Sequence, residues 1–306
     1  MLLTPSFSRT IVSMDTFVTI DVIDPPTEAD CVESVERALG WFSEVERRCS
    51  RFDLDSEVRQ LSANIGSPVV VSDLLFQAVS FALTVAKQSV GAFDPTIGGT
   101  LEARGFNRNY QTGESIDSGL RTADAATYVD VRLDPDCSTI TLLRPLVLDL
   151  GAVAKGLAID LAALELRSFQ NYSINAGGDI YVAGHGPNSD RWNIGIRHPR
   201  HSDGVFETLR VSNAAVCTSG DYERRSEDGF AGHHIVDPKK RRSPRTIASL
   251  TVVAPTAMVA DALGTAAFVL GPHRGVRFLE RQGVEGLVVS AALRSHETKG
   301  FSRYRS

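Results

Sequence analysis

The spacing of apolar residues changes along the chain and predicts a succession of strands and helices. Residues 10–24 alternate between apolar and polar positions, which is typical of a β-strand. Residues 25–52 begin with a Pro-Pro pair and acidic residues, which are signals for the start of a helix. A second helical pattern covers residues 72–89, with Ser72 or Asp73 as its N-cap. The apolar residues of the first helix recur at helical spacing: Val32, Val35, Leu39, Phe42 and Val45.

The second half of the chain is richer in short strand-like runs. Residues 104–127 are polar and contain glycine, so we expect a long surface loop there. Two β-like runs, 138–145 and 145–150, precede a helix over about 152–167, and another helix is predicted over about 256–270. Further short strands are predicted at 172–184, 191–199, 206–222, 248–255 and 285–291. Helices come first and antiparallel-looking strands gather later, which favours an α+β fold with mixed, largely antiparallel sheets and packed helices.

Composition narrows the class of protein. The 306 residues suffice for one large domain or two modest ones, and 42% hydrophobic with 23% charged residues is an ordinary globular balance. The net charge of −5 argues against a nucleic-acid partner, and the basic run 239–242 (KKRR) is interpreted as a solvated loop. No apolar window approaches the length of a transmembrane helix, so membrane insertion is not expected.

Cysteine usage and the N-terminus both favour a cytoplasmic protein. The four cysteines are scattered without a C-x-x-C pair, which predicts reduced thiols rather than a disulfide framework or a zinc site. The first twenty residues lack the apolar stretch and the cleavage site of a signal peptide.

The stretch 147–160 (VLDLGAVAKGLAID) places a carboxylate, a lysine and two glycines where an apolar run passes into a helix. The free N–H groups and the dipole of a helix N-terminus attract anions, and Lys155 in the first turn suits a bound phosphate. We expect Gly151 and Gly156 to let the backbone approach that ligand. The alternative is that Asp149 caps the helix and Lys155 reaches water.

The helix at 256–270 carries a second set of polar groups. Asp261 and Thr265 are four residues apart and therefore share one face. Their neighbours are apolar nearly all round, which indicates burial. A buried carboxylate needs a partner, and a carboxylate with a hydroxyl suits a hard cation such as Mg²⁺. The alternative is a bond from Asp261 to a backbone amide or an arginine.

Two further segments contain short polar groups beside glycine. Asp94 in 91–99 (GAFDPTIGG) and Asn175 in 173–180 (SINAGGDI) could read the edge of a heterocycle or close an Asx-turn. His234 lies beside Asp237-Pro238 and could act as a general base, although a lone histidine is more often structural. The chain has no G-x-G-x-x-G, P-loop, G-x-S-x-G or H-E-x-x-H motif.

In their order along the chain these segments resemble the motifs of the ApbE family, the FAD:protein FMN transferases. The matching blocks are SMDTFVTI, SRFDLDSEVRQL, GAFDPTIGG, LVLDLGAVAKGLAID, INAGGDIYVAG, CTSGDYERR, HHIVDP and SLTVVAPTAMVADALGTAAFVLG. They run from about residue 11 to about residue 290. The resemblance implies a single ApbE-like domain over 1–306 with a T-fold-related architecture.

The resemblance also implies an activity. A threonine or serine hydroxyl of an acceptor flavoprotein attacks the FMN-side phosphorus of FAD in a Mg²⁺-dependent reaction, and AMP leaves. An anion-accepting helix start and a hard-cation site suit such chemistry, because phosphoryl transfer needs charge neutralisation and alignment. Two alternatives stay open: an FAD pyrophosphatase that releases FMN and AMP, and a flavin-binding protein without turnover.

Carried over by position, the family's metal ligands fall on Asp261, Thr265 and the main-chain carbonyl of Ala152. His234 becomes the candidate base on the acceptor hydroxyl, with Asp261 as the other catalytic residue. The implied flavin nucleotide contacts come from several blocks: Met14, Phe52, Ala92, Phe93, Asp94, Asp149, Lys155 and the backbone near Val236. Residues of the glycine-rich block and of another block near the site complete the set: Asn175, Gly177, Gly178, Thr218 and Ser219.

Three departures from the family pattern affect the expected flavin site. Met14-Asp15-Thr16 replaces an M-G-T block, so an aspartate stands at a position of glycine. Residues 237–244 (DPKKRRSP) replace D-P-x-T-G with a more basic loop. Phe52 stands where tyrosine is frequent, which keeps a ring for stacking and loses a hydroxyl. Many bacterial members carry an export signal or a lipoprotein cysteine, whereas this sequence predicts a cytoplasmic enzyme with a cytoplasmic acceptor.

Overall fold

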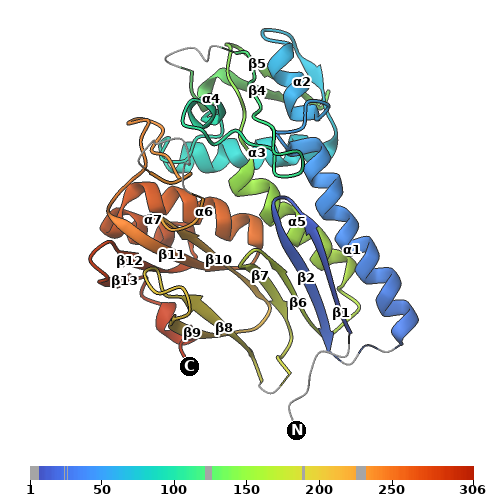
Figure 1. Cartoon of the computed structure of the whole chain (residues 1–306), viewed down its shortest axis with the longest axis vertical. Helices are drawn as coiled ribbons and strands as arrows, with labels where there is room; N and C mark the ends of the chain where they lie inside the picture. Colours follow the sequence, from blue (N-terminus) through green and yellow to red (C-terminus); the bar gives the residue numbers. More distant parts are fainter. Residues whose placement is uncertain (1–6, 24, 26, 121–125, 188–189, 225–231) are drawn as a thin grey trace.

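An eight-stranded antiparallel sheet organises the molecule (Figure 1). The computed structural model describes residues 7–23, 25, 27–120, 126–187, 190–224 and 232–306. The strands follow the order β1-β2-β6-β7-β10-β11-β12-β13 across the sheet. Their bounds are β1 (Phe7–Ser13), β2 (Thr16–Ile23), β6 (Asn171–Ala176), β7 (Asp179–Ala183), β10 (Ala214–Gly220), β11 (Ile247–Ala254), β12 (Glu285–Ser290) and β13 (Ser295–Glu297).

Helices cover one face of this sheet. The helices α1 (Glu28–Cys49), α5 (Gly151–Glu165) and α6 (Ala257–Leu270) pack side by side. The first two each contact two neighbouring strands, and α6 contacts β7, β10 and β11. The helix α7 (Pro272–Gln282) continues the layer over β12. The main hydrophobic core lies between these helices and the sheet and includes Ile20, Phe42 and Phe268, all fully buried. Burial of such side chains is the dominant favourable term in folding.

A second, smaller core lies on the other face of the sheet. The two-stranded sheet of β8 (Trp192–Arg197) and β9 (Val205–Val211) covers this face together with the 3₁₀ turn η2 (Phe301–Tyr304). Trp192 and Leu209 pack there against Val216 of β10 and Leu287 of β12. The sheet therefore separates two apolar layers, which anchors its central strands rigidly.

The remaining elements form the upper part of the molecule in Figure 1. They are α2 (Glu57–Ala63), α3 (Asp73–Gln88), α4 (Gly98–Glu102), the 3₁₀ turn η1 (Tyr128–Asp130) and the small sheet of β3 (Val69–Val70), β5 (Thr139–Leu142) and β4 (Val131–Asp134). Ser72 caps α3 by accepting a hydrogen bond from the Leu75 N–H. Within the described residues, no helix is both long and apolar enough to cross a bilayer.

The structure confirms the α+β class and most of the predicted elements. Residues 104–120 form no helix or strand, as the loop prediction requires, while 121–125 lie outside the described residues. No disulfide bond joins cysteines in the described parts of the chain. The predicted helix at 256–270 is α6, which is buried nearly all round.

Three predictions were wrong in detail. The strand predicted over 10–24 is a hairpin, because Met14 and Asp15 both have positive φ and reverse the chain between β1 and β2. Residues 145–150 form no strand; this segment is buried but makes only one isolated bridge, from Val147 to Ile97. In α1 Val32 is 41% exposed, and the neighbouring Cys31 is buried in its place.

Candidate functional site

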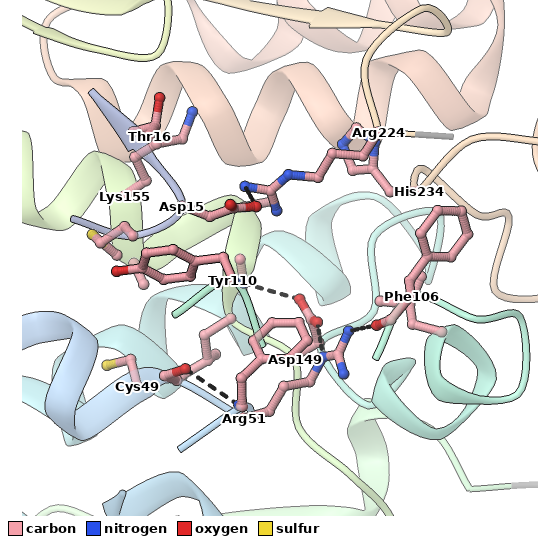
Figure 2. A pocket seen from close by; sticks show the side chains of 18 of the residues that line it. Asp15, Thr16, Cys49, Arg51, Phe106, Tyr110, Asp149, Lys155, Arg224 and His234 are labelled. Atoms are coloured by element: carbon pink, nitrogen blue, oxygen red, sulfur yellow. Dashed lines mark hydrogen bonds and ion pairs between the residues drawn. The ribbon is translucent and has the colours of Figure 1, made fainter. Parts of the chain in front are cut away.

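A cavity of about 1260 Å³ lies where the helix layer, the end of the main sheet and the upper loops meet. Figure 2 shows part of its lining, with Asp15 and Arg224 on one side and Arg51 and Asp149 on the other. Fifteen of the seventeen residues predicted for the site line this cavity: Met14, Phe52, Ala92, Phe93, Asp94, Asp149, Ala152, Lys155, Gly177, Thr218, Ser219, His234, Val236, Asp261 and Thr265. Eight separate segments therefore converge on one pocket.

The helix α6 contributes a buried carboxylate to the pocket. Asp261 is 8% exposed, and its Oδ2 atom has no hydrogen-bond partner. Burial and the neighbouring Asp179 raise the pKa of Asp261 to about 7, although Lys155 opposes the shift. Thr265 lines the pocket one turn later. A buried carboxylate oxygen without a donor is costly, so this position favours a proton or a cation.

The first turn of α6 is fixed from outside the pocket. Asp160 of α5 accepts hydrogen bonds from the backbone N–H groups of Ala257 (2.7 Å) and Met258 (3.0 Å). Those N–H groups lack partners within their own helix, so the carboxylate satisfies both. Thr256 adds an N-cap bond from the Val259 N–H at 3.4 Å. The rotation of α6, and with it the direction of Asp261, is thereby set by α5.

The start of α5 brings Asp149 and its partner Arg51 to the pocket wall. Asp149 Oδ2 accepts from Arg51 Nε at 2.5 Å, and its Oδ1 accepts from the Gly151 N–H at 2.9 Å. Burial opposes ionisation of Asp149, but the Arg51 charge and these hydrogen bonds hold its pKa below the ordinary value. Arg51 also donates to the carbonyl of Phe106 and lies over the Phe52 ring, 4.0 Å from its centroid. Asp149 thus caps the helix start in part and is an anion at neutral pH.

Lys155 does not reach freely into water. Its ammonium group forms an ion pair with Asp179, whose side chain is 5% exposed, while that of Lys155 is 25% exposed. Burial lowers the pKa of Lys155, but the carboxylates of Asp179 and Asp261 outweigh burial and raise it. Asp179 Oδ1 also accepts from the Thr218 N–H at 3.2 Å. A fixed positive charge therefore lies close to Asp261.

The two glycines of the α5 start have different roles. Gly151 lines the pocket, as expected for close approach of a ligand. Gly156 does not, because a Cβ at this position would lie 2.4 Å from the Met258 Cα of α6. The expectation that both glycines approach the ligand was therefore wrong for Gly156, which permits contact between two helices.

The segment around Asp94 forms a buried turn. Asp94 Oδ1 accepts from the Thr96 N–H (2.9 Å) and hydroxyl (2.7 Å), and Oδ2 accepts from the Tyr128 N–H at 3.1 Å. Burial raises the pKa of Asp94, while these hydrogen bonds oppose the shift. Ala92 and Phe93 are buried beside it. The Asx-turn interpretation describes this carboxylate well.

The glycine-rich block divides between the pocket and the surface. A Cβ on Gly177 would lie 2.3 Å from the Thr16 hydroxyl oxygen, so only glycine fits between the hairpin and β7. Asn175 is exposed, and its Oδ1 accepts from the Gly178 N–H at 2.9 Å. Asn175 and Gly178 do not line the cavity. Their geometry is that of a turn.

His234 lies in the pocket beside the loop that follows β10. The backbone N–H of His234 donates to the Arg224 carbonyl at 3.1 Å. The Nδ1 atom of its ring is buried without a hydrogen-bond partner. Burial and the charge of Arg224 lower the pKa of His234 to about 3, so the ring is neutral at pH 7. Val236 lines the pocket two residues later. The predicted CTSGDYERR block ends at Arg225, which lies outside the described residues.

Several pocket residues escaped the sequence interpretation. Asp179 follows directly after the two glycines, and the need of a buried lysine for a partner could have drawn attention to it. Arg51 precedes Phe52 in its block, and Arg224 belongs to the CTSGDYERR block. Tyr110 comes from the long loop, which carried no recognisable motif. Arg51 and Asp149 form an ion pair although they are 98 residues apart in the sequence, and no local pattern reveals such a contact.

The donor set of the pocket can hold a hard cation. No group of three or more His, Cys, Asp or Glu side chains in the described structure could hold a metal ion. The oxygens of Asp261, Thr265 and the Ala152 main chain nevertheless belong to residues of one cavity wall, and the Asp261 Oδ2 atom lacks a donor. Mg²⁺ prefers such oxygen ligands and usually keeps positions for water and phosphate. The residues present therefore fit a magnesium ion.

Comparison with known proteins identifies the family. Residues 14–288 match the ApbE family. The FAD:protein FMN transferase of Treponema pallidum is 30% identical over 317 residues, with 96% of this chain and 87% of the relative covered. The FAD:protein FMN transferase of Haemophilus influenzae is 28% identical over 287 residues, covering 89% of this chain and 82% of the relative.

Solved structures agree with the sequence comparison. The ApbE protein from Thermotoga maritima superposes with a TM-score of 0.85 at 28% identity, covering 98% of this chain and 99% of the other. The flavin transferase ApbE from Vibrio cholerae gives a TM-score of 0.84 at 26% identity, covering 98% and 100%. Fold and site thus define an enzyme of the transferase class. The chain belongs to the ApbE family.

Proposed function

We propose that this enzyme transfers FMN from FAD to a threonine or serine hydroxyl of an acceptor flavoprotein, with Mg²⁺ as cofactor and AMP as the second product. The observation that carries the proposal is the unpartnered Oδ2 atom of Asp261, next to the Lys155–Asp179 ion pair in a cavity large enough for a dinucleotide. The names of the relatives and the preserved order of the motifs support the choice of FAD and of a protein acceptor.

Each side chain has a defined task in this reaction. The acceptor oxygen forms a bond to the FMN-side phosphorus, and the bond from that phosphorus to the bridging oxygen of AMP breaks. His234 is neutral at pH 7 and its Nδ1 atom lacks a partner, so the ring can accept a hydrogen bond from the attacking hydroxyl. A pKa of about 3 makes it a weak base, and its role as the proton acceptor requires that the negative charge of bound FAD raise this pKa. Lys155 supplies a fixed positive charge for the phosphates, and the N-terminus of α5 adds N–H donors.

A second positive charge for the phosphates would come from the metal. Asp261, Thr265 and the Ala152 carbonyl would hold Mg²⁺. When bound, Mg²⁺ neutralises negative charge on the transferring phosphoryl group. The carboxylate of Asp179 stays with Lys155 and keeps that ammonium group in place. The single-domain organisation and a cytoplasmic acceptor remain predictions.

The test uses FAD, MgCl₂ and a flavoprotein domain with a threonine in its flavinylation motif. The matched control is the same domain with that threonine replaced by alanine. We expect the acceptor to gain the mass of FMN less water, with AMP released in equal amount, only when threonine is present. Release of free FMN and AMP with either domain would support the pyrophosphatase alternative. Intact FAD in all mixtures would leave flavin binding alone.

A further inference from the structure

An ion pair on one side of the pocket joins two segments that lie far apart in sequence. Asp15 belongs to the β1–β2 turn, and Arg224 belongs to the loop after β10 (Figure 2). The Asp15 Oδ2 atom lies 3.2 Å from a terminal nitrogen of Arg224. Both side chains are about half exposed, at 48% and 55%, and both line the cavity. Asp15 is also the residue at which this chain departs from the glycine of the family block.

The backbone beneath Asp15 is held firmly. Met14 and Asp15 adopt φ values of 53° and 61°, a left-handed turn that suits a hairpin. The Glu46 Oε2 atom of α1 accepts from the Ser13 hydroxyl (3.0 Å), the Met14 N–H (3.1 Å) and the Tyr110 hydroxyl (3.1 Å). Two of these hydrogen bonds hold the turn against α1, and the third ties Tyr110 of the long loop to the same carboxylate oxygen. The Asp15 carboxylate therefore projects from a rigid support.

Arg224 brings a positive charge to the lining of the pocket. Its carbonyl accepts from the His234 N–H at 3.1 Å, which ties its backbone to the candidate base. Its guanidinium charge helps to lower the pKa values of Asp149 and His234, and it opposes the rise in the pKa of Asp261. The Arg224 charge thus acts on carboxylates from both α6 (Asp261) and the segment before α5 (Asp149). A guanidinium has five donors, and the pairing with Asp15 through one nitrogen leaves others for a second anion.

The pocket needs such a cation. Arg51 is paired with Asp149 and Lys155 with Asp179, so a carboxylate offsets part of the positive charge that each of them offers to a bound phosphate. A dinucleotide adds the two negative charges of its pyrophosphate to this cavity. Arginine binds phosphate oxygens through two parallel donors, a geometry that lysine does not provide.

We propose that Arg224 binds the pyrophosphate of FAD and that Asp15 is a positioning residue that holds the Arg224 side chain toward it. This inference rests on the proposed function, because it takes FAD as the ligand. Asp15 replaces a flexible glycine with a carboxylate on a fixed turn. The guanidinium is thereby ordered before the substrate arrives, which reduces the entropy lost on binding.

The experiment compares flavins with and without phosphate on the full chain. Dissociation constants for FAD and for riboflavin are measured by flavin fluorescence at low and high salt. We expect Arg224→Gln to raise the Kd for FAD about tenfold or more and to leave riboflavin within about twofold. Arg224→Lys should lie between wild type and Arg224→Gln. Arg210→Gln, a change on an exposed arginine of β9, serves as the matched control and should leave both constants unchanged.

The role of Asp15 is read from a double-mutant cycle. Introduced into the wild-type chain, Asp15→Asn should raise the Kd for FAD by about threefold to tenfold. Introduced into the Arg224→Gln variant, the same change should have no further effect on that Kd. Additive effects would overturn the positioning role. Equal loss of FAD and riboflavin, or no loss of either in Arg224→Gln, would overturn the phosphate contact. A wild-type chain that binds no FAD would instead overturn the proposed function, and melting curves verify that each variant is folded.

Discussion

Met258 lies so close to Gly156 that a Cβ on the glycine would stand 2.4 Å from the Met258 Cα. This backbone contact sets the separation of α5 and α6. Because α5 carries Lys155 and α6 carries Asp261, the same contact sets the spacing of the two charges in the pocket.

Gly156→Ala should therefore destabilise the protein even though alanine favours helix. Overpacking costs about 1–3 kcal/mol, which exceeds the gain of about 1 kcal/mol in helix propensity. Gly40→Ala in α1 is the matched control, since nothing lies within 4 Å of a Cβ there, and it should be neutral or stabilising. Urea unfolding measures both. Equal effects of the two changes would contradict this explanation of Gly156.

Lys155→Met should destabilise the fold by roughly 3 kcal/mol, because it leaves Asp179 buried without its cation. Arg210→Met removes the exposed partner of Asp190 and should change the free energy of unfolding by less than about 1 kcal/mol. Chemical unfolding of both variants provides the comparison. A loss for Lys155→Met as small as that for Arg210→Met would show that Asp179 finds another partner.

Stability should fall below pH 6.5 through His234. Its pKa drops from 6.5 to about 3 on folding, so between these values the unfolded chain binds a proton that the folded chain excludes. The contribution is intact above pH 6.5 and declines by up to about 1.4 kcal/mol per pH unit as the pH falls toward 3. His234→Gln should flatten this part of the stability curve, whereas His201→Gln, an exposed change, should not. Thermal melts across the range decide between them.

Magnesium should raise the melting temperature of the wild type but not that of Asp261→Asn. An amide supplies no negative charge, so FAD turnover that depends on Mg²⁺ should fall to background in this variant. Because the pKa of Asp261 is about 7, protons compete with the cation below that pH. The Mg²⁺ concentration for half-maximal stabilisation should rise about fivefold between pH 7 and pH 6, because half of the carboxyl groups are already protonated at pH 7. A variant that keeps full Mg²⁺-dependent turnover would sink the metal assignment.

The periodicity of apolar residues predicted the helices and strands that bury one face. It missed the features that depend on a turn or on burial without regular pairing. The hairpin at Met14–Asp15 was hidden because alternation continues through the turn without a glycine to mark it. The apolar residues Leu146, Val147, Leu148 and Leu150 are buried in the core, and their hydrophobicity does not reflect pairing in a sheet. The helix α7 follows Gly271 and begins at Pro272, a usable start signal that the interpretation overlooked.

The site was predictable where motifs keep their order and unpredictable where charges meet across the fold. Asp261 and Thr265 could be placed together because helical spacing is local. The partners Asp179 and Arg51 could not, because an ion pair depends on which elements the sheet brings together. Family resemblance supplied the set of residues that converge, but not their pairing.

The carboxylate of Asp160 has a consequence for how variants of this enzyme are interpreted. It lies outside the cavity lining, yet it holds the two N–H groups that begin α6. If these two hydrogen bonds are lost, α6 can turn about its axis and carry Asp261 away from the position proposed for the metal, with every pocket side chain still present. In kinetics such a variant would resemble a substitution of the proposed metal ligand Asp261, although Asp160 does not line the pocket. The geometry of the pocket thus depends on a residue of α5 that does not line it.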